Sequence, residues 1–265
     1  MIRLGTGLMS AAYWRPRAGL LPATTALVAR MTAAPPAGRV VAIDALVRAL
    51  VAAGVWSRLD LLHVLAAHDT QAARLNWISS AYDLAAYNSP LFTAHRGFKG
   101  DGTAAYLEAA GYNPSAATLR FAQNSMTLGA WMLTPSSAAV GLDVYGGNSR
   151  VQRRTSGSND LHYRANDGTS TFWPSGGALD GLMVADRADA ATKALYRNGA
   201  LTHSAAVAST GNSTILRLFA AGAGSAMSDA EIAVVFAGAS LTEAQHAALH
   251  AALRTYLLKV GAIAP

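Results

Sequence analysis

Leu195-Tyr196-Arg197-Asn198-Gly199-Ala200-Leu201 is the stretch of this sequence that decides its fold. The dipeptide Asn198-Gly199 stands between two runs in which apolar side chains alternate with others. Both residues of a tight hairpin turn need a positive φ angle, which Gly and Asn adopt most readily. The stretch therefore predicts two antiparallel strands joined by a two-residue turn, and it indicates antiparallel sheet in the last third of the chain.

Short segments of β type, each bounded by Gly, Asn, Asp, Ser or Pro, continue this pattern in both directions. We expect strands at residues 75–78, 91–93, 105–107, 128–133, 138–145, 150–155, 161–165, 169–173, 181–185, 193–197, 201–205, 214–219 and 232–237. Many short strands with regular turn signals predict an antiparallel sandwich or jelly roll. A helix should close the chain, because Ser240 and Thr242 can each cap it and Gly261 can end it. Its apolar stripe, including Leu249 and Leu253, should pack on the sandwich.

The segment before the strands has helical periodicity. Thr24 or Thr25 can cap a first helix, which should stop at Pro35-Pro36 because proline lacks an N–H donor. A second helix should end at Gly54. A third helix is expected after Val55, with Leu59, Leu62 and Leu65 at helical spacing. Helices this short cannot bury much surface alone, so we expect them to pack on the sandwich or on another chain.

Residues 1–21 have no clear periodicity but are more apolar and aromatic than a free tail. Tyr13, Trp14, Arg15 and Arg17 are the candidate anchoring residues of this arm. Either the arm docks on a partner, or it folds back on its own domain. The expected organisation is an arm at residues 1–21, a helical subdomain at residues 22–72 and a β-sandwich at residues 73–265.

Composition narrows the function classes. The 265 residues carry a net charge of +6 and only 14% charged residues, which is typical of a chain partly covered by neighbours or of one rich in Ala and Gly. Arg150, Arg153 and Arg154 form the one dense basic cluster, too little for a nucleic-acid surface. The absence of cysteine excludes disulfides and thiolate-bound zinc. No apolar run reaches the ~18 residues of a membrane span.

Motifs for catalysis are not found. The three glutamates, Glu108, Glu231 and Glu243, lack the Glu-x-Asp spacing that glycosidases of sandwich fold use to flank a sugar bond. His246 and His250 share a helix face, but Ala247 stands where a zinc protease needs Glu. Polar turn residues explain the Asp and Asn clusters more simply than calcium does. We therefore expect no enzyme activity, no cofactor and no metal.

Several consecutive motifs resemble a known family. They are Trp56-Ser57-Arg58-Leu59-Asp60, Leu65-Ala66-Ala67-His68-Asp69, Gln71-Ala72-Ala73-Arg74-Leu75-Asn76-Trp77, Asn88-Ser89-Pro90, Arg96-Gly97-Phe98 and Tyr106-Leu107. Their order resembles bacteriophage and prophage virion proteins with a concanavalin-A-like (laminin-G-like) jelly-roll domain, over about residues 22–265. The resemblance implies a mainly β fold of this type with a small N-terminal helical subdomain and a C-terminal helix.

The same resemblance implies a structural role on a phage or phage-like particle. The protein would be a surface-exposed tail-fibre, spike or head-decoration component, made in the bacterial cytoplasm and located in the virion. Its partners would be other virion proteins and further copies of itself, a trimer being one option. One alternative is a receptor-binding lectin that recognises host cell-surface polysaccharide, and a less favoured one is a glycosidase of the same fold.

Sugar binding needs aromatic faces beside polar side chains that reach hydroxyl groups. The candidate residues between positions 145 and 173 are Tyr145, Arg150, Arg153, His162, Arg164 and Trp173. Strand alternation predicts that His162 and Arg164 share one face, with Leu161 and Tyr163 on the other. The simpler interpretation of the same residues is a solvated sheet face beside core aromatics. Trp131, between apolar neighbours, is expected in the core.

Overall fold

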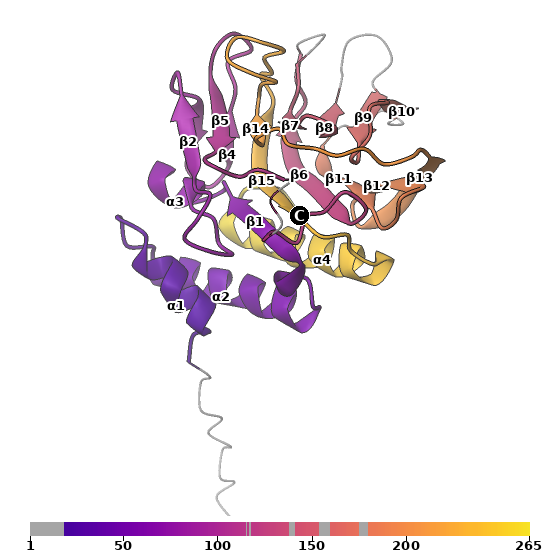
Figure 1. The fold of residues 1–265 in the computed structure, drawn as a ribbon. Helices are drawn as coiled ribbons and strands as arrows, with labels where there is room; N and C mark the ends of the chain where they lie inside the picture. The colour runs from indigo at the N-terminus through magenta and orange to yellow at the C-terminus, as the bar shows by residue number, and fades with distance from the viewer. Residues whose placement is uncertain (1–18, 115, 117, 138–140, 154–159, 175–179) are drawn as a thin grey trace, which may run out of the picture.

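The computed structural model of the chain describes residues 19–114, 116, 118–137, 141–153, 160–174 and 180–265. It is a β-sandwich of two antiparallel sheets with a layer of helices against one of them. Figure 1 shows this layer, formed by α1 (Pro22–Ala29), α2 (Ala37–Ala52) and α4 (Glu243–Val260), on one side of the strands. Among the described residues, no helix is long and apolar enough to span a membrane.

The first sheet, sheet A, has eight strands. Along the sheet they are β13 (Ala200–Ala206), β12 (Thr192–Arg197), β11 (Gly181–Arg187), β6 (Met126–Thr134), β15 (Glu231–Gly238), β4 (Gly97–Lys99) and β3 (Leu91–Thr93), with β1 (Leu59–Val64) also paired to β15. Strand β15 contacts β4 through its first residues and β1 through its later ones. The two short strands therefore share one edge of β15.

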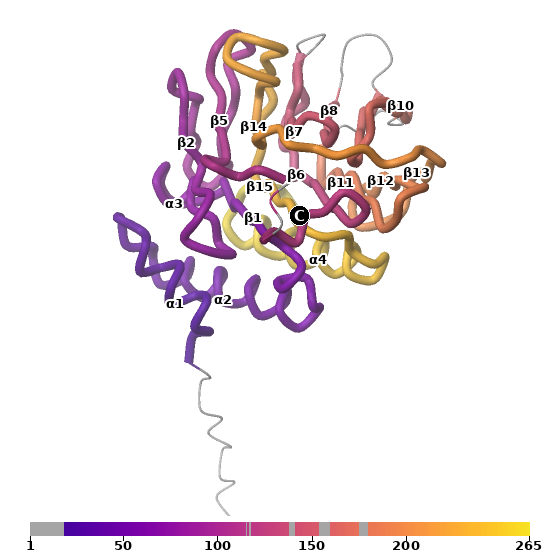
Figure 2. The backbone as a smooth tube through the Cα atoms, in the orientation of Figure 1, coloured from indigo at the N-terminus to yellow at the C-terminus, as the bar shows by residue number. Residues whose placement is uncertain are grey.

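The second sheet, sheet B, has seven strands. Along the sheet they are β10 (Thr171–Pro174), β9 (Asp160–Arg164), β8 (Ser149–Arg153), β7 (Val144–Gly146), β14 (Arg217–Leu218), β5 (Tyr106–Ala109) and β2 (Leu84–Tyr87). Figure 2 shows these strands side by side, from β2 at one edge to β10 at the other. Both sheets are antiparallel throughout, so the mainly β jelly-roll-like sandwich predicted from the sequence is confirmed.

Two apolar clusters hold the layers together. One lies between the sheets and includes Leu107 and Val151 from sheet B with Met132 and Val235 from sheet A. The other lies between sheet A and the helices and includes Val234. Val234 and Val235 are neighbours on β15 that point to opposite faces, and both are fully buried. Sheet A is thus buried on both faces, whereas the outer face of sheet B lies outside both apolar clusters.

The hairpin predicted at Asn198-Gly199 is confirmed. Both turn residues have positive φ, 48° for Asn198 and 82° for Gly199, and they join β12 to β13. The Asn198 side-chain oxygen also accepts a hydrogen bond of 2.9 Å from the backbone N–H of Leu182 on β11. The turn is therefore tied to the next strand of the sheet.

The closing helix is also confirmed, as α4. Thr242 and Gln245 form a reciprocal capping box at its start, and Gly261, in the left-handed conformation, ends it. The predicted stripe is buried, with Leu249 and Leu253 facing sheet A. Buried Asp186 of β11 accepts hydrogen bonds from the Ser240 hydroxyl at 2.6 Å and the Leu241 N–H at 3.1 Å, which fixes the start of the helix to the sheet.

The third helix expected after Val55 is wrong. A single 3-10 turn, η1 (Trp56–Arg58), leads directly into strand β1. Every residue of β1 is buried, because the strand is covered on one face by the helices and on the other by sheet B. A strand buried on both faces carries apolar residues on both sides, so Leu59 and Leu62 match a helical spacing without forming a helical stripe. Residues from the expected helical subdomain therefore belong to sheet A.

Three smaller expectations are also corrected. Thr24 lies inside α1, which begins at Pro22, and its hydroxyl donates to Asp44 at 2.8 Å instead of capping the helix. Residues 75–78 form no strand, and they follow the short helix α3 (Thr70–Arg74). The strand expected at 214–219 is only the two-residue β14. For Thr24, a contact with another helix replaces the local preference for capping.

Candidate functional site

The outer face of sheet B carries most of the predicted binding residues. Along β9, Leu161 and Tyr163 belong to the core between the sheets, so His162 and Arg164 point to the other face. The alternation predicted from the sequence is confirmed. Helices α1, α2 and α4 lie on the far side of sheet A, which leaves this face outside the helical layer (Figure 1).

One row across this face is cationic and aromatic. Tyr145 of β7 pairs with Arg150 of β8, which in turn pairs with Arg164 of β9. Cβ atoms of directly paired residues lie about 4.5–5.5 Å apart, so the three side chains are neighbours. All three are half-buried, which leaves part of each accessible to solvent. The register of sheet B thus brings together residues that are separated in the sequence.

A second row contains the exposed ring of the face. Gln152 pairs with His162, and His162 pairs with Phe172 of β10. The two rings meet edge to face, with centroids 4.0 Å apart. Phe172 is 54% exposed, and it is the only phenylalanine among the exposed large apolar side chains of the described residues. Sequence reasoning missed Phe172, because only the register with β9 shows on which face of β10 it lies.

The row of Tyr145 continues to the other edge of the sheet. Arg217 of β14 pairs with Tyr145, and its Nε atom donates to Glu108 of β5 at 2.7 Å. Next to Glu108, Tyr106 stacks on Tyr87 with ring centroids 4.6 Å apart and planes 7° from parallel. Tyr87 is 41% exposed. The face therefore has an exposed aromatic ring near each edge and arginines between them.

Two of the predicted binding residues do not reach this face. Arg153 shares the inner face of β8 with Val151 and is almost fully buried, which lowers its pKa to about 10 against the opposing effect of Asp143. Trp173 packs on the core between the sheets and stacks on His203 of β13, with centroids 4.5 Å apart. Both are odd-numbered neighbours of outward residues, so strand alternation turns them inward.

The anchoring candidates Tyr13, Trp14, Arg15 and Arg17 lie outside the described residues. The described chain begins just after them, at Gly19, whose carbonyl accepts a hydrogen bond of 2.5 Å from Arg48 of α2. The Leu21 N–H donates to Asp44 of the same helix at 2.8 Å. These contacts place the end of the arm against the helical layer, on the side of sheet A away from sheet B.

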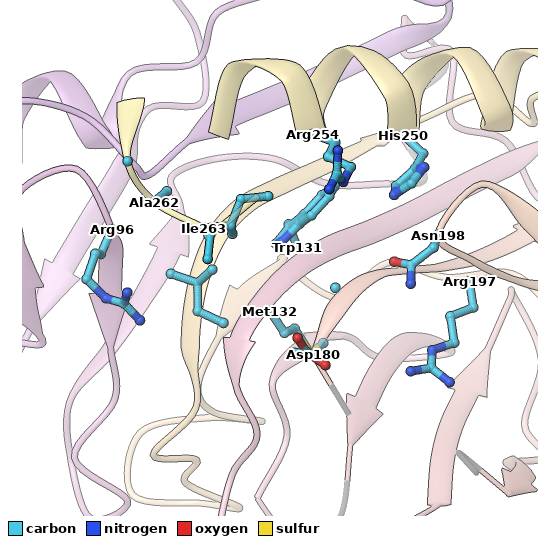
Figure 3. Close-up of a pocket in the computed structure, with 14 residues that line it drawn as sticks. Arg96, Trp131, Met132, Asp180, Arg197, Asn198, His250, Arg254, Ala262 and Ile263 are labelled. Carbon is cyan, nitrogen blue, oxygen red and sulfur yellow. The ribbon is translucent and has the colours of Figure 1, made fainter. Parts of the chain in front are cut away.

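A hollow of about 720 Å³ lies between α4, the residues after it and the ends of β6 and β11. In Figure 3, His250 and Arg254 project from α4 toward Trp131, with Arg96 and Arg197 on opposite sides. Trp131 stacks on His250 and is only 5% exposed, so it is in the core as predicted and offers little ring surface to a ligand. Arg96 already donates two 2.8 Å hydrogen bonds to Glu231.

Two of the three glutamates and one buried aspartate already have partners within the protein. Glu108 binds Arg217, and Glu231 binds Arg96. Buried Asp143 accepts from the Ser228 hydroxyl at 2.7 Å, and burial raises its pKa. In the part of the chain that the structure describes, no group of three or more His, Cys, Asp or Glu side chains is arranged to hold a metal ion.

Comparison with known proteins supports the fold. No protein-family model matches the chain, and no curated protein matches it in sequence. Solved structures do: the chain is similar to the botulinum neurotoxin serotype D binding domain (TM-score 0.53, 10% identity, 74% of this chain and 52% of that one). It is also similar to domain 4 of an extracellular arabinanase from Geobacillus stearothermophilus, solved with arabinotriose (TM-score 0.50, 11% identity, 72% and 98%).

A third similar structure is a mutant Trypanosoma rangeli sialidase with trans-sialidase activity (TM-score 0.54, 12% identity, 83% of this chain and 40% of that one). This chain thus spans about half of the neurotoxin binding domain and less than half of the sialidase chain. Because all three identities are far below 25%, the likeness shows a shared jelly-roll-like fold and nothing beyond the fold. Function has to be argued from the residues of this chain.

Proposed function

We propose that this protein is a glycan-binding protein and that it binds through the outer face of sheet B. The observation that carries the proposal is the exposed Phe172 ring beside Arg150, Arg164 and His162 on one side of the sheet. An aromatic face covers the apolar side of a sugar ring, and guanidinium groups donate to its hydroxyls. The likeness in fold to an arabinanase domain solved with arabinotriose supports this class of ligand.

The test is binding of the purified protein to a glycan array, repeated with two variants. Phe172→Ala removes the ring on the outer face and should abolish binding. Leu201→Ala removes another exposed apolar side chain, 47% exposed on β13 of sheet A, and should leave binding unchanged. Equal binding by Phe172→Ala and the unmodified protein would place the ligand elsewhere. Trp173→Ala is no test of this face, because that ring packs between the sheets.

We further propose that the protein performs this binding without catalysis. Glycoside hydrolysis needs two carboxyl groups on either side of the sugar bond. On sheet B, Glu108 is held by Arg217 on one side and pairs with Ala85 on the other, so neither directly paired residue is a second carboxylate. Incubation with each glycan that binds, followed by a reducing-sugar assay, should give no product. Release of sugar would refute this part of the proposal.

The location we propose is the surface of a phage or phage-like particle, on the resemblance of residues 56–107 to virion proteins. Attachment through the helical layer and the arm would leave sheet B facing outward (Figure 1). Immunogold labelling of purified particles should find the protein on their surface.

Deletion of residues 1–21 should leave a soluble protein that no longer joins the particle, and normal incorporation would refute the anchoring role. Light scattering of the purified protein should show a homo-oligomer.

A further inference from the structure

The two arginines in the centre of the proposed binding face converge on one neutral group. Arg150 and Arg164 are directly paired on β8 and β9, a position at which like charges destabilise a sheet. Nε of Arg164 donates to the Ser170 hydroxyl at 2.9 Å, and Nη2 of Arg150 donates to the same oxygen. Two guanidinium groups from neighbouring strands therefore point at one position on the outer face of sheet B.

Arg164 is also close to other charged groups. Asp167, a buried carboxylate three residues after Arg164, already accepts from Nζ of Lys193 at 2.9 Å and from the Thr169 N–H at 2.9 Å. The charge of Arg164 acts on Lys193 as well, because it is among the causes that lower the pKa of that lysine, after burial. Asp160 lies four residues from Arg164, at the far end of β9, about 13 Å away. Within the described residues, no carboxylate forms a salt bridge with Arg164.

The distance between the Phe172 ring and Arg164 matches the length of one sugar unit. Phe172 faces His162, and His162 is two residues from Arg164 on the same side of β9. Two residues of a strand span about 7 Å, which is the size of one pyranose with a substituent. A sugar ring seated against Phe172 would therefore place a substituent between the two guanidinium groups. Planar guanidinium groups match carboxylate and sulfate oxygens particularly well.

We propose that the outer face of sheet B selects acidic sugars, with the sugar ring on Phe172 and its anionic group held between Arg150 and Arg164. This inference rests on the proposed function and names the ligand class for the same face. The anion would replace the Ser170 hydroxyl as the partner of both arginines. It would convert the repulsion between them into two charge-assisted hydrogen bonds.

The experiment is a calorimetric titration of the full-length protein with paired oligosaccharides. Oligomers containing galacturonate, mannuronate or terminal sialate are each compared with the same oligomer after its carboxyl groups have been reduced to alcohols. Sulfated heparin fragments form a third arm. We expect at least one acidic member to bind at least about tenfold more tightly than its neutral form, since a charge-assisted hydrogen bond is worth that factor. The preference should shrink as salt rises from about 50 to about 300 mM.

Two variants locate the effect. Arg164→Gln keeps a hydrogen-bond donor for Ser170 but removes the charge, and it should abolish the preference for the acidic member. Arg254→Gln removes the same charge from α4, at the hollow of Figure 3, and should leave the preference unchanged.

Binding to neutral members as tight as to acidic or sulfated ones would overturn the inference and leave the glycan-binding function standing. Binding to no member of any set, by a protein shown to be folded, would overturn both. Preference for the sulfated fragments alone would assign the anionic group as sulfate. A preference lost in Arg254→Gln and retained in Arg164→Gln would also overturn the inference, because the anion would then lie at α4.

Discussion

Replacing His63 should make the protein markedly more resistant to mild acid. His63 lies on β1, fully buried, and neither ring nitrogen has a hydrogen-bond partner among the described residues. Burial lowers its pKa from 6.5 to about 4, against the opposing effects of the Leu75 backbone and the Asp83 charge. The folded protein therefore keeps this ring neutral at pH values where the unfolded chain takes up a proton.

The size and sign of the effect follow from proton linkage. Above the unfolded pKa of 6.5, both states are neutral and His63 carries no penalty. As the pH falls from 6.5 toward 4, the unfolded state binds more protons, so the free energy of unfolding decreases. At about pH 5 the penalty is about 2 kcal/mol, and it approaches about 3 kcal/mol near the folded pKa. His63→Leu should remove this loss.

Urea unfolding of His63→Leu and of the unmodified protein at a series of pH values measures the stability that His63 costs in acid. The stability difference between His63→Leu and the unmodified protein should grow by about 2 kcal/mol between about pH 7.5 and about pH 5. Burial also lowers the pKa of His95 and of His250, but both remain in each protein and cancel. Val235→Ala, at the residue paired with His63, serves as control and should cost the same at every pH. Parallel pH profiles for His63→Leu and the unmodified protein would refute this account of His63.

Three further substitutions, the last with a matched control, test the fold. Thr242→Ala removes the capping box of α4 and should lower the free energy of unfolding by about 1 kcal/mol in urea titrations, and no change would mean that the cap is dispensable. Lys193→Met removes the closer of the two ion-pair partners of fully buried Asp167, leaving Arg187 at 4.0 Å, and should cost about 3 kcal/mol, with a correspondingly lower thermal midpoint. Gly129→Ala puts a Cβ 2.3 Å from the Phe236 ring and should strongly destabilise the protein, whereas Gly38→Ala in α2, with nothing within 4 Å, should not. Equal midpoints for the two glycine variants would contradict the close packing of β6 on β15.

The fold class could be predicted from the sequence because its strongest signals are local. Asn198-Gly199 needs only its own two φ angles to make a hairpin, and Thr242 with Gln245 needs only one helical turn to make a cap. Strand β1 could not be predicted in the same way. Its leucines satisfy a helical spacing, and only the layers on both sides of it decide that the segment is extended.

The candidate site was partly predictable for a similar reason. Alternation within β9 correctly placed His162 and Arg164 together, because one strand carries that information. The convergence of Arg150 with Arg164, and the position of Phe172 beside His162, depend on the register between strands. Alternation turns Arg153 and Trp173 inward, but only the pairing of β8 and β10 with β9 shows which face of each strand is the inner one. The residue types alone therefore do not define the binding surface, because the pairing of β8, β9 and β10 decides which side chains lie together on it.

A crystal structure of the full-length protein soaked with an oligosaccharide that it binds tests the central claim most directly. The account predicts electron density for a sugar ring against Phe172, with a substituent in contact with Arg150 and Arg164 on the outer face of sheet B. Density for the sugar in the hollow beside His250 and Arg254, with sheet B unoccupied, would contradict it.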